Sequence, residues 1–196
     1  MGNLNNFQQL NIRTLIKNNG ENWVREKIEN FSCPLNPEIE KFLKKNAIDF
    51  TKKSQSVTYL VSPIDEFFAV GYFTLAIKPF VIGVNDIRSN SQRKKIERIS
   101  RIDDKIQSYT MAAYLIAQLG KNYYHNLNEK ISGKDLLGSA LKVIERLQYD
   151  VGGMVAFVET EERKKLVEFY NRNYFFSLEN KKITDSNEFI QLFRLL

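Results

Sequence analysis

The hydrophobic pattern of the first half of the chain predicts one helix followed by two strands. Apolar residues recur at helical spacing over residues 39–50, directly after an Asn-Pro-Glu sequence at 36–38 that is typical of a helix start. Residues 57–61 are rich in β-branched and aromatic side chains, and residues 67–77 show the same composition without alternation. We therefore expect a helix, a strand, and a longer strand that is covered on both faces.

The second half of the chain predicts alternating strands and helices. Residues 109–119 form an apolar run that ends at Gly120, and residues 154–158 follow a Gly-Gly pair as a short strand of the fully buried kind. Ser132 and Asp135 fit a capping box that opens a helix with an apolar stripe. The remaining expected elements are a helix capped by Thr160 with Glu161 and Glu162 at its positive end, and closing strands over residues 175–178 and 189–195. This order predicts a mixed α/β domain with one central sheet.

The length of the chain is typical of one domain. It has 196 residues, and a domain contains roughly 150. Residues 1–35 are rich in Asn and Gln and have enough apolar pattern for one strand and one short helix. We interpret residues 1–35 as an N-terminal extension and residues 36–196 as the folded domain.

The composition excludes several kinds of site. The chain is 43% hydrophobic and 27% charged, which is typical of a globular protein. The single cysteine, Cys33, excludes an intrachain disulfide and a multi-cysteine zinc site, and the single histidine, His125, excludes a His-rich metal site. The longest apolar run, residues 111–117, is shorter than a membrane span, and the N-terminus has no signal-peptide pattern. We expect a cytoplasmic protein with neither a metal nor a membrane partner.

Basic residues are concentrated in one segment. The net charge of the chain is +6, and residues 88–105 contain three acids against a larger set of bases: Arg88, Arg93, Lys94, Lys95, Arg98, Arg101 and Lys105. Such a segment is either a solvated face or a contact for the phosphates of a nucleic acid or of a phosphorylated cofactor. No aromatic residue is interleaved with these bases, which argues against a platform for stacking single-stranded bases.

The helix that begins at Ser132 is a candidate anion site. The first turn of a helix has free backbone N–H groups and the positive end of the helix dipole. Gly133 lets a phosphate approach the backbone, and Lys134 adds a positive charge. The glycine spacing of a nucleotide P-loop is missing, and Asp135 follows the lysine where serine or threonine is required. A helix start that binds only water is the plainer alternative.

The order of these motifs resembles the GCN5-related N-acetyltransferase superfamily. A strand, a loop, a helix, a second strand, and a helix carrying Phe169-Tyr170 before an aromatic strand start follow one another as they do there. Upstream, the segments that resemble the branch of bacterial toxins acetylating aminoacyl-tRNA are 31–33, 42–43, 56–60 and 70–75. The resemblance extends over roughly residues 31–195, and the Phe-Tyr pair and the Gly-Tyr-Phe-Thr-Leu sequence at 71–75 are its more specific parts.

The resemblance implies a site for acetyl-CoA. It implies a single domain whose central sheet is splayed between strands 109–119 and 154–158, with helices on both faces. The pantetheine would pair with the backbone near Leu119, Gly120 and Lys121. The pyrophosphate would rest on the N–H groups of the following residues: Ile131, Ser132, Gly133, Lys134, Asp135 and Leu136. Asp135 and Leu137 stand where the superfamily has small residues.

The resemblance also implies that Tyr170 is the general acid. A phenol has a pKa near 10, so it is protonated at pH 7 and can give its proton to a departing thiolate. The acceptor would be a neutral primary amine that attacks the thioester directly, with no covalent enzyme intermediate. Strand 109–119 has no Asp or Glu to take the proton of the amine, which leaves water, the substrate, or an acid elsewhere such as Glu159.

Three functional hypotheses follow. The first is a toxin-like N-acetyltransferase that moves an acetyl group from acetyl-CoA to the amine of an aminoacyl-tRNA, or to the amine of a protein or small molecule. Its further partners would be an antitoxin protein and a second copy of the chain. The second is a binding or regulatory module, because the Asp135 carboxylate would compete with a phosphate for the same N–H groups. The third, a plain nucleic-acid binder, has no helix-turn-helix or RNA-binding motif in its support.

Overall fold

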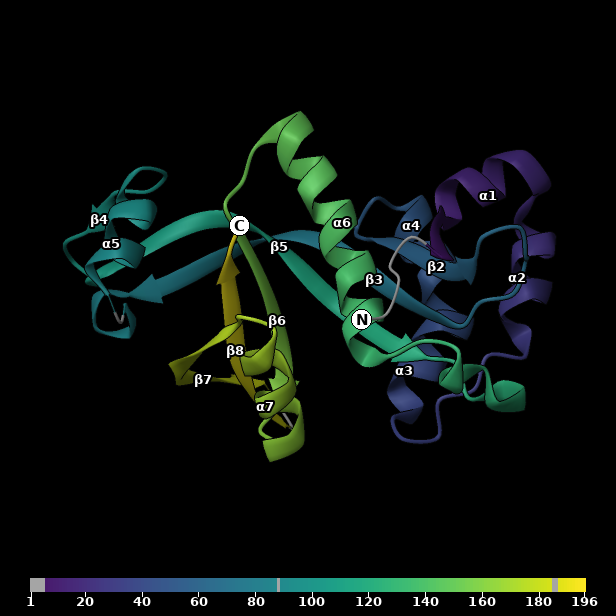
Figure 1. Ribbon diagram of the computed structural model, residues 1–196. Coiled ribbons are helices and arrows are strands. Elements are labelled where there is room, and N and C mark those ends of the chain that lie inside the picture. The colour runs from purple at the N-terminus through teal and green to yellow at the C-terminus, as the bar shows by residue number, and fades with distance from the viewer. Residues whose placement is uncertain (1–5, 88, 185–186) are drawn as a thin grey trace. The chain divides into compact units, whose positions relative to one another are not determined.

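The computed structural model describes residues 6–87, 89–184 and 187–196 of the chain. Within these residues the strands form one sheet in the order β1-β2-β3-β5-β6-β8-β7, and β4 pairs with β5 (Figure 1). The strands are β1 (Phe7–Asn11), β2 (Val57–Pro63), β3 (Gly71–Gly83), β4 (Ile102–Asp103), β5 (Ser108–Lys121), β6 (Val155–Glu161), β7 (Phe176–Thr184) and β8 (Asn187–Leu195). This single mixed sheet with helices confirms the α/β fold predicted from the sequence.

The helices lie between the strands in the predicted alternation. They are α1 (Ile12–Asn19), α2 (Glu21–Glu29), α3 (Pro37–Lys41), α4 (Ala47–Lys52), α5 (Asn90–Glu97), α6 (Gly133–Val151) and α7 (Lys164–Arg172), with the short turns η2 (Phe42–Asn46), η3 (Val84–Asp86) and η4 (Tyr124–Glu129). The chain divides into two compact units. The first contains residues 1–76 and 116–146, and the second contains residues 77–115 and 147–196.

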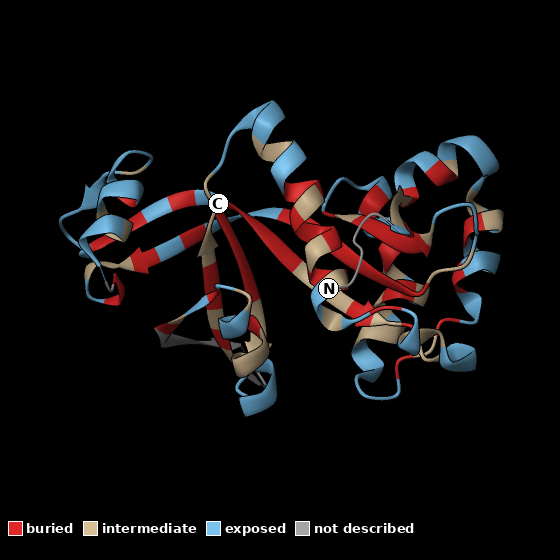
Figure 2. Ribbon diagram, in the orientation of Figure 1, coloured by how far each residue is buried: buried red, intermediate tan, exposed pale blue. Residues whose placement is uncertain are grey.

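The core of the first unit lies between its helices and the strands β2 and β3. Tyr72 of β3 is fully buried, its ring packs edge-on against Phe31 at 5.2 Å, and its hydroxyl donates to the carbonyl of Ile39 at 2.6 Å. The other buried members come from α1 to α4 and β2: Ile12, Leu15, Val24, Ile28, Cys33, Leu43, Ala47, Ile48 and Leu60. Figure 2 shows the same concentration of buried residues along these strands. Burial of this apolar surface drives the helices onto the sheet.

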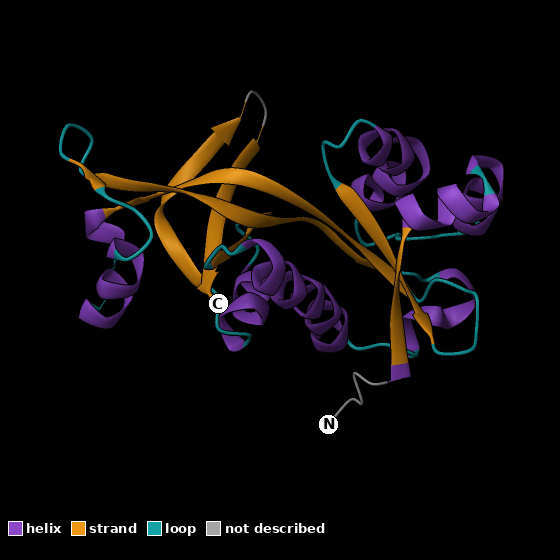
Figure 3. Ribbon diagram, turned by 90° about the horizontal axis from the view of Figure 1, so that it is seen from above, coloured by secondary structure: helices purple, strands orange, loops and turns teal. Residues whose placement is uncertain are grey.

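Residues before the expected boundary at residue 35 take part in this core. Strand β1 pairs antiparallel with β2, with Leu10 opposite Leu60, and leads directly into α1 (Figure 3). Asn11 caps α1 by accepting the N–H of Arg13 at 2.8 Å. The division into an N-terminal extension and a domain from residue 36 stays a prediction.

The helix predicted to begin after Asn36 is confirmed. The Asn36 side chain accepts the N–H of Glu38 at 3.2 Å, and Pro37 occupies the first helical position. The helix then passes through the π-helical turn η2 and continues as α4 to Lys52. The extra residue of a π turn shifts the apolar face of α4 relative to that of α3.

The core of the second unit is aromatic. Phe80 of β3 packs against Phe157 of β6 and Phe193 of β8, at ring distances of 5.0 and 5.6 Å. Strands β6 and β8 pair antiparallel along the full length of β6, from Val155 to Glu161. This ladder positions the strand that precedes α7.

Two expectations from the sequence are wrong. Thr160 does not cap a helix, because it belongs to β6 and pairs with Ile190 of β8. Pairing with β8 extends β6 as far as Glu161, whose carboxylate binds Arg163 at 2.6 Å. As a result α7 begins only after Arg163, without a side-chain capping bond.

The second correction concerns the start of β3. The strand begins at Gly71 rather than at residue 67. The turn that follows β2 is closed by the Ser62 hydroxyl, which donates to the carbonyl of Glu66 at 2.7 Å. The apolar residues 67–70, which resemble a strand in the sequence, therefore lie between this turn and β3.

Candidate active site

Two glycines in the first unit allow β3, β5 and α6 to meet closely. A Cβ atom on Gly71 would lie 2.9 Å from the carbonyl oxygen of Gly120 and 3.0 Å from Cδ1 of Leu136. A Cβ atom on Gly120 would lie 2.4 Å from Cγ2 of Ile39. Only residues without a side chain fit at these two positions. Gly120 and Leu136, two of the expected site residues, therefore both lie next to Gly71, where β3, β5 and α6 pack together.

The chain leaves β5 through Asn122, a buried residue that holds three other segments. Its side-chain carbonyl accepts the N–H groups of Ser32 and Tyr124, each at 3.0 Å. Its side-chain amide donates to the carbonyl of Ala69 at 2.8 Å. Its backbone N–H donates to Val70 at 2.8 Å. Asn122 fixes where the loop between β5 and α6 begins, and it is not among the site residues predicted from the sequence. The only signal for it was a turn-forming residue after Gly120 and Lys121.

Lys121 connects the two segments expected to bind the cofactor. Its ammonium group donates to the carbonyl of Ile131 at 3.0 Å. Lys121 and Leu119 are half-buried, whereas Gly120 and Ile131 are buried. The structure therefore brings the end of β5 and the start of α6 together within the first unit.

The predicted cap of α6 is present. The Ser132 hydroxyl accepts the N–H of Asp135 at 3.1 Å and donates to the Asp135 carboxylate at 2.6 Å. The first helical bond runs from the N–H of Leu136 to the carbonyl of Ser132, at 3.0 Å. The N–H groups of Gly133 and Lys134 precede it, so they have no acceptor within the helix. The α6 start thus offers two donors at the positive end of a long helix, beside a carboxylate held by Ser132.

The single histidine and the single cysteine add no nucleophile to this site. His125 is exposed and takes a left-handed backbone conformation, with φ of 48°, in the loop before α6. Cys33 is 4% exposed, and burial raises the pKa of its thiol. A thiol that stays protonated is a poor nucleophile, so neither residue suggests a covalent mechanism.

Tyr170 belongs to the second unit, where it is the buried residue of α7. Its ring meets the rings of Phe169 and Phe175 at 5.1 and 5.6 Å. Its carbonyl accepts the N–H groups of Asn173 and Phe175, at 2.9 and 3.1 Å, and Tyr174 adopts a positive φ of 66°. This tight turn at the end of α7 folds Phe175 back against the Tyr170 ring.

The surroundings of Tyr170 keep its phenol protonated. The residue is 8% exposed, and burial raises the pKa of its hydroxyl to about 12. Burial acts in this direction because a phenolate loses more hydration than a phenol does. The group can therefore donate a proton at neutral pH but cannot act as a base there.

The parallel pairing of β5 with β6 is short. Tyr114 lies opposite Ala156 and Leu115 lies opposite Phe157. The ladder consists of these two positions in the described residues, although β5 continues to Lys121 and β6 to Glu161. Short pairing between these strands agrees with the splayed sheet that the resemblance implies.

A tyrosine and the Gly-Gly pair fix the start of β6. The Tyr114 hydroxyl donates to the carbonyl of Gly152. Gly153 has a φ of 102°, and a Cβ atom there would lie 2.8 Å from Cε2 of Tyr114. In the sequence, these glycines indicate only a break between two elements. The structure shows that they wrap around the Tyr114 ring and so position the strand.

Glu159, the candidate base, is half-buried on β6. Its Oε1 accepts the side-chain amide of Gln191, its partner on β8, at 2.8 Å. This hydrogen bond occupies one carboxylate oxygen of Glu159.

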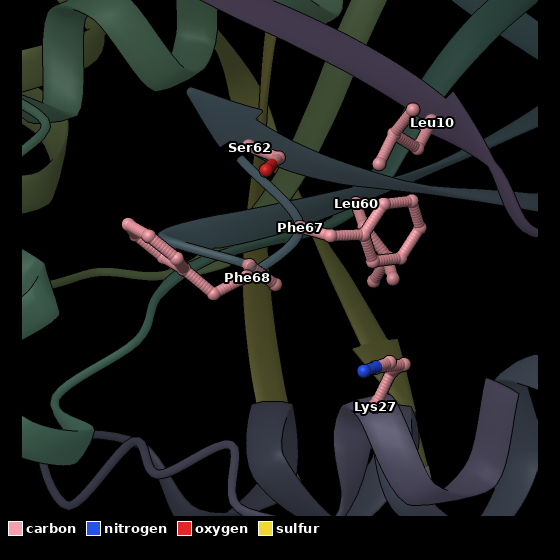
Figure 4. A pocket seen from close by; sticks show the side chains of 7 residues that line it. Leu10, Lys27, Leu60, Ser62, Phe67 and Phe68 are labelled. Atoms are coloured by element: carbon pink, nitrogen blue, oxygen red, sulfur yellow. The ribbon is translucent and has the colours of Figure 1, made fainter. Parts of the chain in front are cut away.

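A hollow in the first unit contains none of the expected site residues. It is lined by Leu10, Lys27, Leu60, Ser62, Phe67, Phe68 and Ala69 (Figure 4). Phe67 packs edge-on against Trp23 at 4.8 Å, and the Lys27 ammonium lies 5.3 Å from the Trp23 ring centre. The lining is mainly apolar with one cation at its edge.

No helix in the described part of the chain is long and apolar enough to cross a membrane. Among the same residues, no group of three or more His, Cys, Asp and Glu side chains could hold a metal ion.

Comparison with known proteins gives matches among solved structures. No family model and no curated protein sequence matches the chain. A structure of AtaT complexed with acetyl-methionyl-tRNAfMet is 19% identical, covers 86% of both chains and has a TM-score of 0.62. A structure of AtaTR bound with acetyl-CoA is 17% identical over 97% of this chain and 94% of the other, with a TM-score of 0.63. A tyrosine-to-phenylalanine mutant of KacT is 20% identical over 86% of both chains, with a TM-score of 0.60.

These similarities concern nearly the whole chain. At such low sequence identity they establish the fold and leave the substrate open. The chain has the fold of the AtaT and KacT structures, and this agrees with the fold that its sequence motifs predicted.

Proposed function

We propose that the protein is an N-acetyltransferase that transfers an acetyl group from acetyl-CoA to the primary amine of an aminoacyl-tRNA. The observation that carries this proposal is the fold shared with AtaT, a toxin whose structures include complexes with acetyl-methionyl-tRNAfMet and acetyl-CoA. The features of the α6 start and of Tyr170 add support from the residues themselves.

The residues at the start of α6 fit the phosphates of acetyl-CoA. The N–H groups of Gly133 and Lys134 have no acceptor in the helix, and anions favour this end of a helix. Backbone groups of Leu119, Gly120 and Lys121 would hold the pantetheine, and residues 131–136 would hold the pyrophosphate. The Ser132 hydroxyl donates to the Asp135 carboxylate. This hydrogen bond holds the carboxylate in place and leaves the N–H groups of Gly133 and Lys134 free.

The chemistry requires little of the protein beyond a proton donor. Bound acetyl-CoA supplies a thioester, and attack by a neutral amine forms the C–N bond as the C–S bond breaks. The Tyr170 hydroxyl gives its proton to the departing sulfur, as a general acid. The proton of the amine passes to water, to the acceptor, or to an acid elsewhere such as Glu159.

The same proposal names the partners and the place of action. An antitoxin protein would neutralise the enzyme, since a structure of AtaT bound to the C-terminus of the antitoxin AtaR is among the similar structures. A cytoplasmic location and a homodimer are parts of the proposal with less support. An amine on a protein or a small molecule is the alternative acceptor.

A second candidate function rests on the sequence at the α6 start. Asp135 and Leu137 replace small residues, and the Asp135 carboxylate adds negative charge where phosphates would bind. A module that keeps the fold without catalysis would follow if acetyl-CoA does not bind. Calorimetry with acetyl-CoA up to millimolar concentration decides between the two, because an enzyme must bind it.

The role of Tyr170 is tested by the variant Tyr170→Phe, which removes only the hydroxyl. We expect the turnover for acetylation of mixed aminoacyl-tRNA to fall by about 10²-fold or more. Transfer is measured with radiolabelled acetyl-CoA by precipitating the tRNA. Tyr149→Phe is the matched control, because Tyr149 is 91% exposed, and it should leave turnover unchanged.

Two outcomes would contradict the proposal. If Tyr170→Phe folds and keeps full turnover on an identified acceptor, Tyr170 is not the acid. If the unmodified protein binds acetyl-CoA and acetylates no aminoacyl-tRNA, the acceptor is wrong.

A further inference from the structure

Five cations of the second unit form an exposed basic surface. They lie on α5 and in the segments that flank β4: Lys94, Lys95, Arg98, Arg101 and Lys105. All five are exposed, and Figure 2 shows the same exposure along α5 and β4. Among the residues that the structure describes, none of the five forms an ion pair. Arg88, the first base of this sequence segment, lies outside the described residues.

Two of the three acids in this segment, Glu97 and Asp103, are engaged with the protein itself. Glu97 accepts the hydroxyl of Tyr109 at 3.2 Å. Asp103 closes a turn by accepting the backbone N–H groups of Lys105 and Ile106, at 2.9 and 3.4 Å. These acids therefore serve local structure, and the basic surface keeps an excess of positive charge.

Packing and hydrogen bonds hold the basic surface in place. Ile96 of α5 is 1% exposed and Tyr109 of β5 is 3% exposed, so both anchor the helix. The Ser100 hydroxyl donates to the carbonyl of Thr110 at 2.8 Å, which ties the segment after α5 to β5. Ser89 caps α5 by accepting the N–H of Gln92 at 3.1 Å. A fixed set of cations binds a polyanion at a lower entropy cost than a mobile tail would.

We propose that the basic surface binds the sugar–phosphate backbone of an RNA duplex. The inference rests on the proposed function in one respect, since the acceptor would then be carried by an RNA with base-paired stems. Residues 90–107 contain no aromatic side chain, so this surface cannot stack bases and would not read sequence. Phosphate contacts by lysine and arginine position an RNA without reading its bases.

The experiment measures the affinity for uncharged tRNA and for an RNA hairpin of unrelated sequence, by fluorescence anisotropy without acetyl-CoA. The test variant combines Lys94→Gln, Lys95→Gln and Arg98→Gln. Each phosphate contact adds about 0.7–0.9 to the slope of log Kd against log salt. We expect the slope to fall by about 2 and the Kd at low salt to rise by about tenfold or more, equally for both RNAs.

A matched control separates a local contact from net charge. It combines Lys17→Gln, Lys45→Gln and Lys53→Gln, which remove the same charge from exposed positions of the first unit. We expect this control to keep nearly the original slope. A second variant, Lys94→Arg with Lys95→Arg, keeps the charge and should keep the affinity. Thermal unfolding confirms that each variant is folded.

Two results would overturn the proposal. One is an unchanged Kd and slope in the test variant. The other is retained RNA binding with lost binding to polyglutamate, which would assign the surface to an acidic protein through its cations and its exposed side chains Ile102 and Ile106. Because RNA binding is measured without acetyl transfer, an inactive protein would refute the proposed function and leave this measurement valid.

Discussion

At the scale of single residues, the burial of Tyr170 sets the strength of the proposed acid. Its pKa is raised to about 12, whereas an aliphatic thiol such as that of cysteine has a pKa near 8.5. Proton transfer from this phenol to a free thiolate is therefore uphill. An acid that is too weak contributes less to the rate, so we expect Tyr170→Phe to act near the lower end of the usual range, at about 10²-fold.

The same pKa predicts the pH dependence of acetyl transfer. The amine must be neutral, and an α-amino group has a pKa of roughly 8, so kcat/KM should rise about tenfold per pH unit below that value. Tyr170 stays protonated well above pH 10, because its pKa is raised to about 12. We expect a plateau up to pH 10 without a descending limb.

This profile is measured with an amide-linked aminoacyl-tRNA analogue, because the natural ester hydrolyses in base. A descending limb with a pKa below about 10 that disappears in Tyr170→Phe would show that the phenol is far more acidic than its burial implies.

At the scale of elements, the start of α6 combines attraction and repulsion for an anion. The helix dipole and the free N–H groups of Gly133 and Lys134 favour a phosphate. The Asp135 carboxylate opposes it from the first turn, although the Ser132 hydroxyl donates to that carboxylate at 2.6 Å. Because the hydrogen bonds of the cap are satisfied, the charge of Asp135 decides the net effect on the affinity for acetyl-CoA.

The variant Asp135→Asn removes that charge and keeps the size of the side chain. An anion near a helix N-terminus is worth about 0.3–1 kcal/mol, so we expect the Kd for acetyl-CoA to fall by about twofold to fivefold at low salt. The gain should shrink in 0.5 M salt because of screening. Calorimetry measures both, with Glu145→Gln, an exposed acid further along α6, as the control. Equal affinities for the unmodified protein and Asp135→Asn at low salt would show that no phosphate lies near Asp135.

At the scale of the whole molecule, one buried polar residue joins segments that are far apart in the chain. Asn122 binds Ser32, which is 90 residues away, and Ala69, which is 53 residues away. It thus connects the segment after α2, the segment before β3 and the loop before α6. A buried polar side chain whose hydrogen bonds are satisfied by these segments specifies one arrangement of them.

Asn122→Ala would remove the hydrogen bonds that Asn122 makes to the half-buried residues Ser32 and Ala69. Each partner group left unsatisfied costs about 1–3 kcal/mol, so we expect the free energy of unfolding to fall by about 2–4 kcal/mol. Urea denaturation measures this change. Asn18→Ala, at an exposed position of α1, should change the stability by less than about 0.5 kcal/mol. A similar small change for Asn122→Ala would mean that the loop before α6 is not held by this residue.

The sequence was informative wherever neighbours along the chain decide the structure. The cap of the helix after Asn36, the Ser132–Asp135 cap and the apolar strands were predictable, because caps and periodicity depend on residues a few positions apart. The Gly-Tyr-Phe-Thr-Leu and Phe-Tyr motifs indicated the fold. The strand at Thr160 was not predictable, because its pairing with Ile190 depends on a distant segment.

By itself, the sequence determined the elements, the fold class, the basic segment and the absence of a cysteine or histidine cluster. Only the tertiary structure decided that Gly71 and Gly120 pack so closely that a Cβ atom on Gly71 would lie 2.9 Å from the Gly120 carbonyl oxygen. It also decided that Asn122 holds three segments and that Tyr170 is buried. Propensity and periodicity are local, whereas close approach, buried hydrogen bonds and a shifted pKa depend on which distant residues come together.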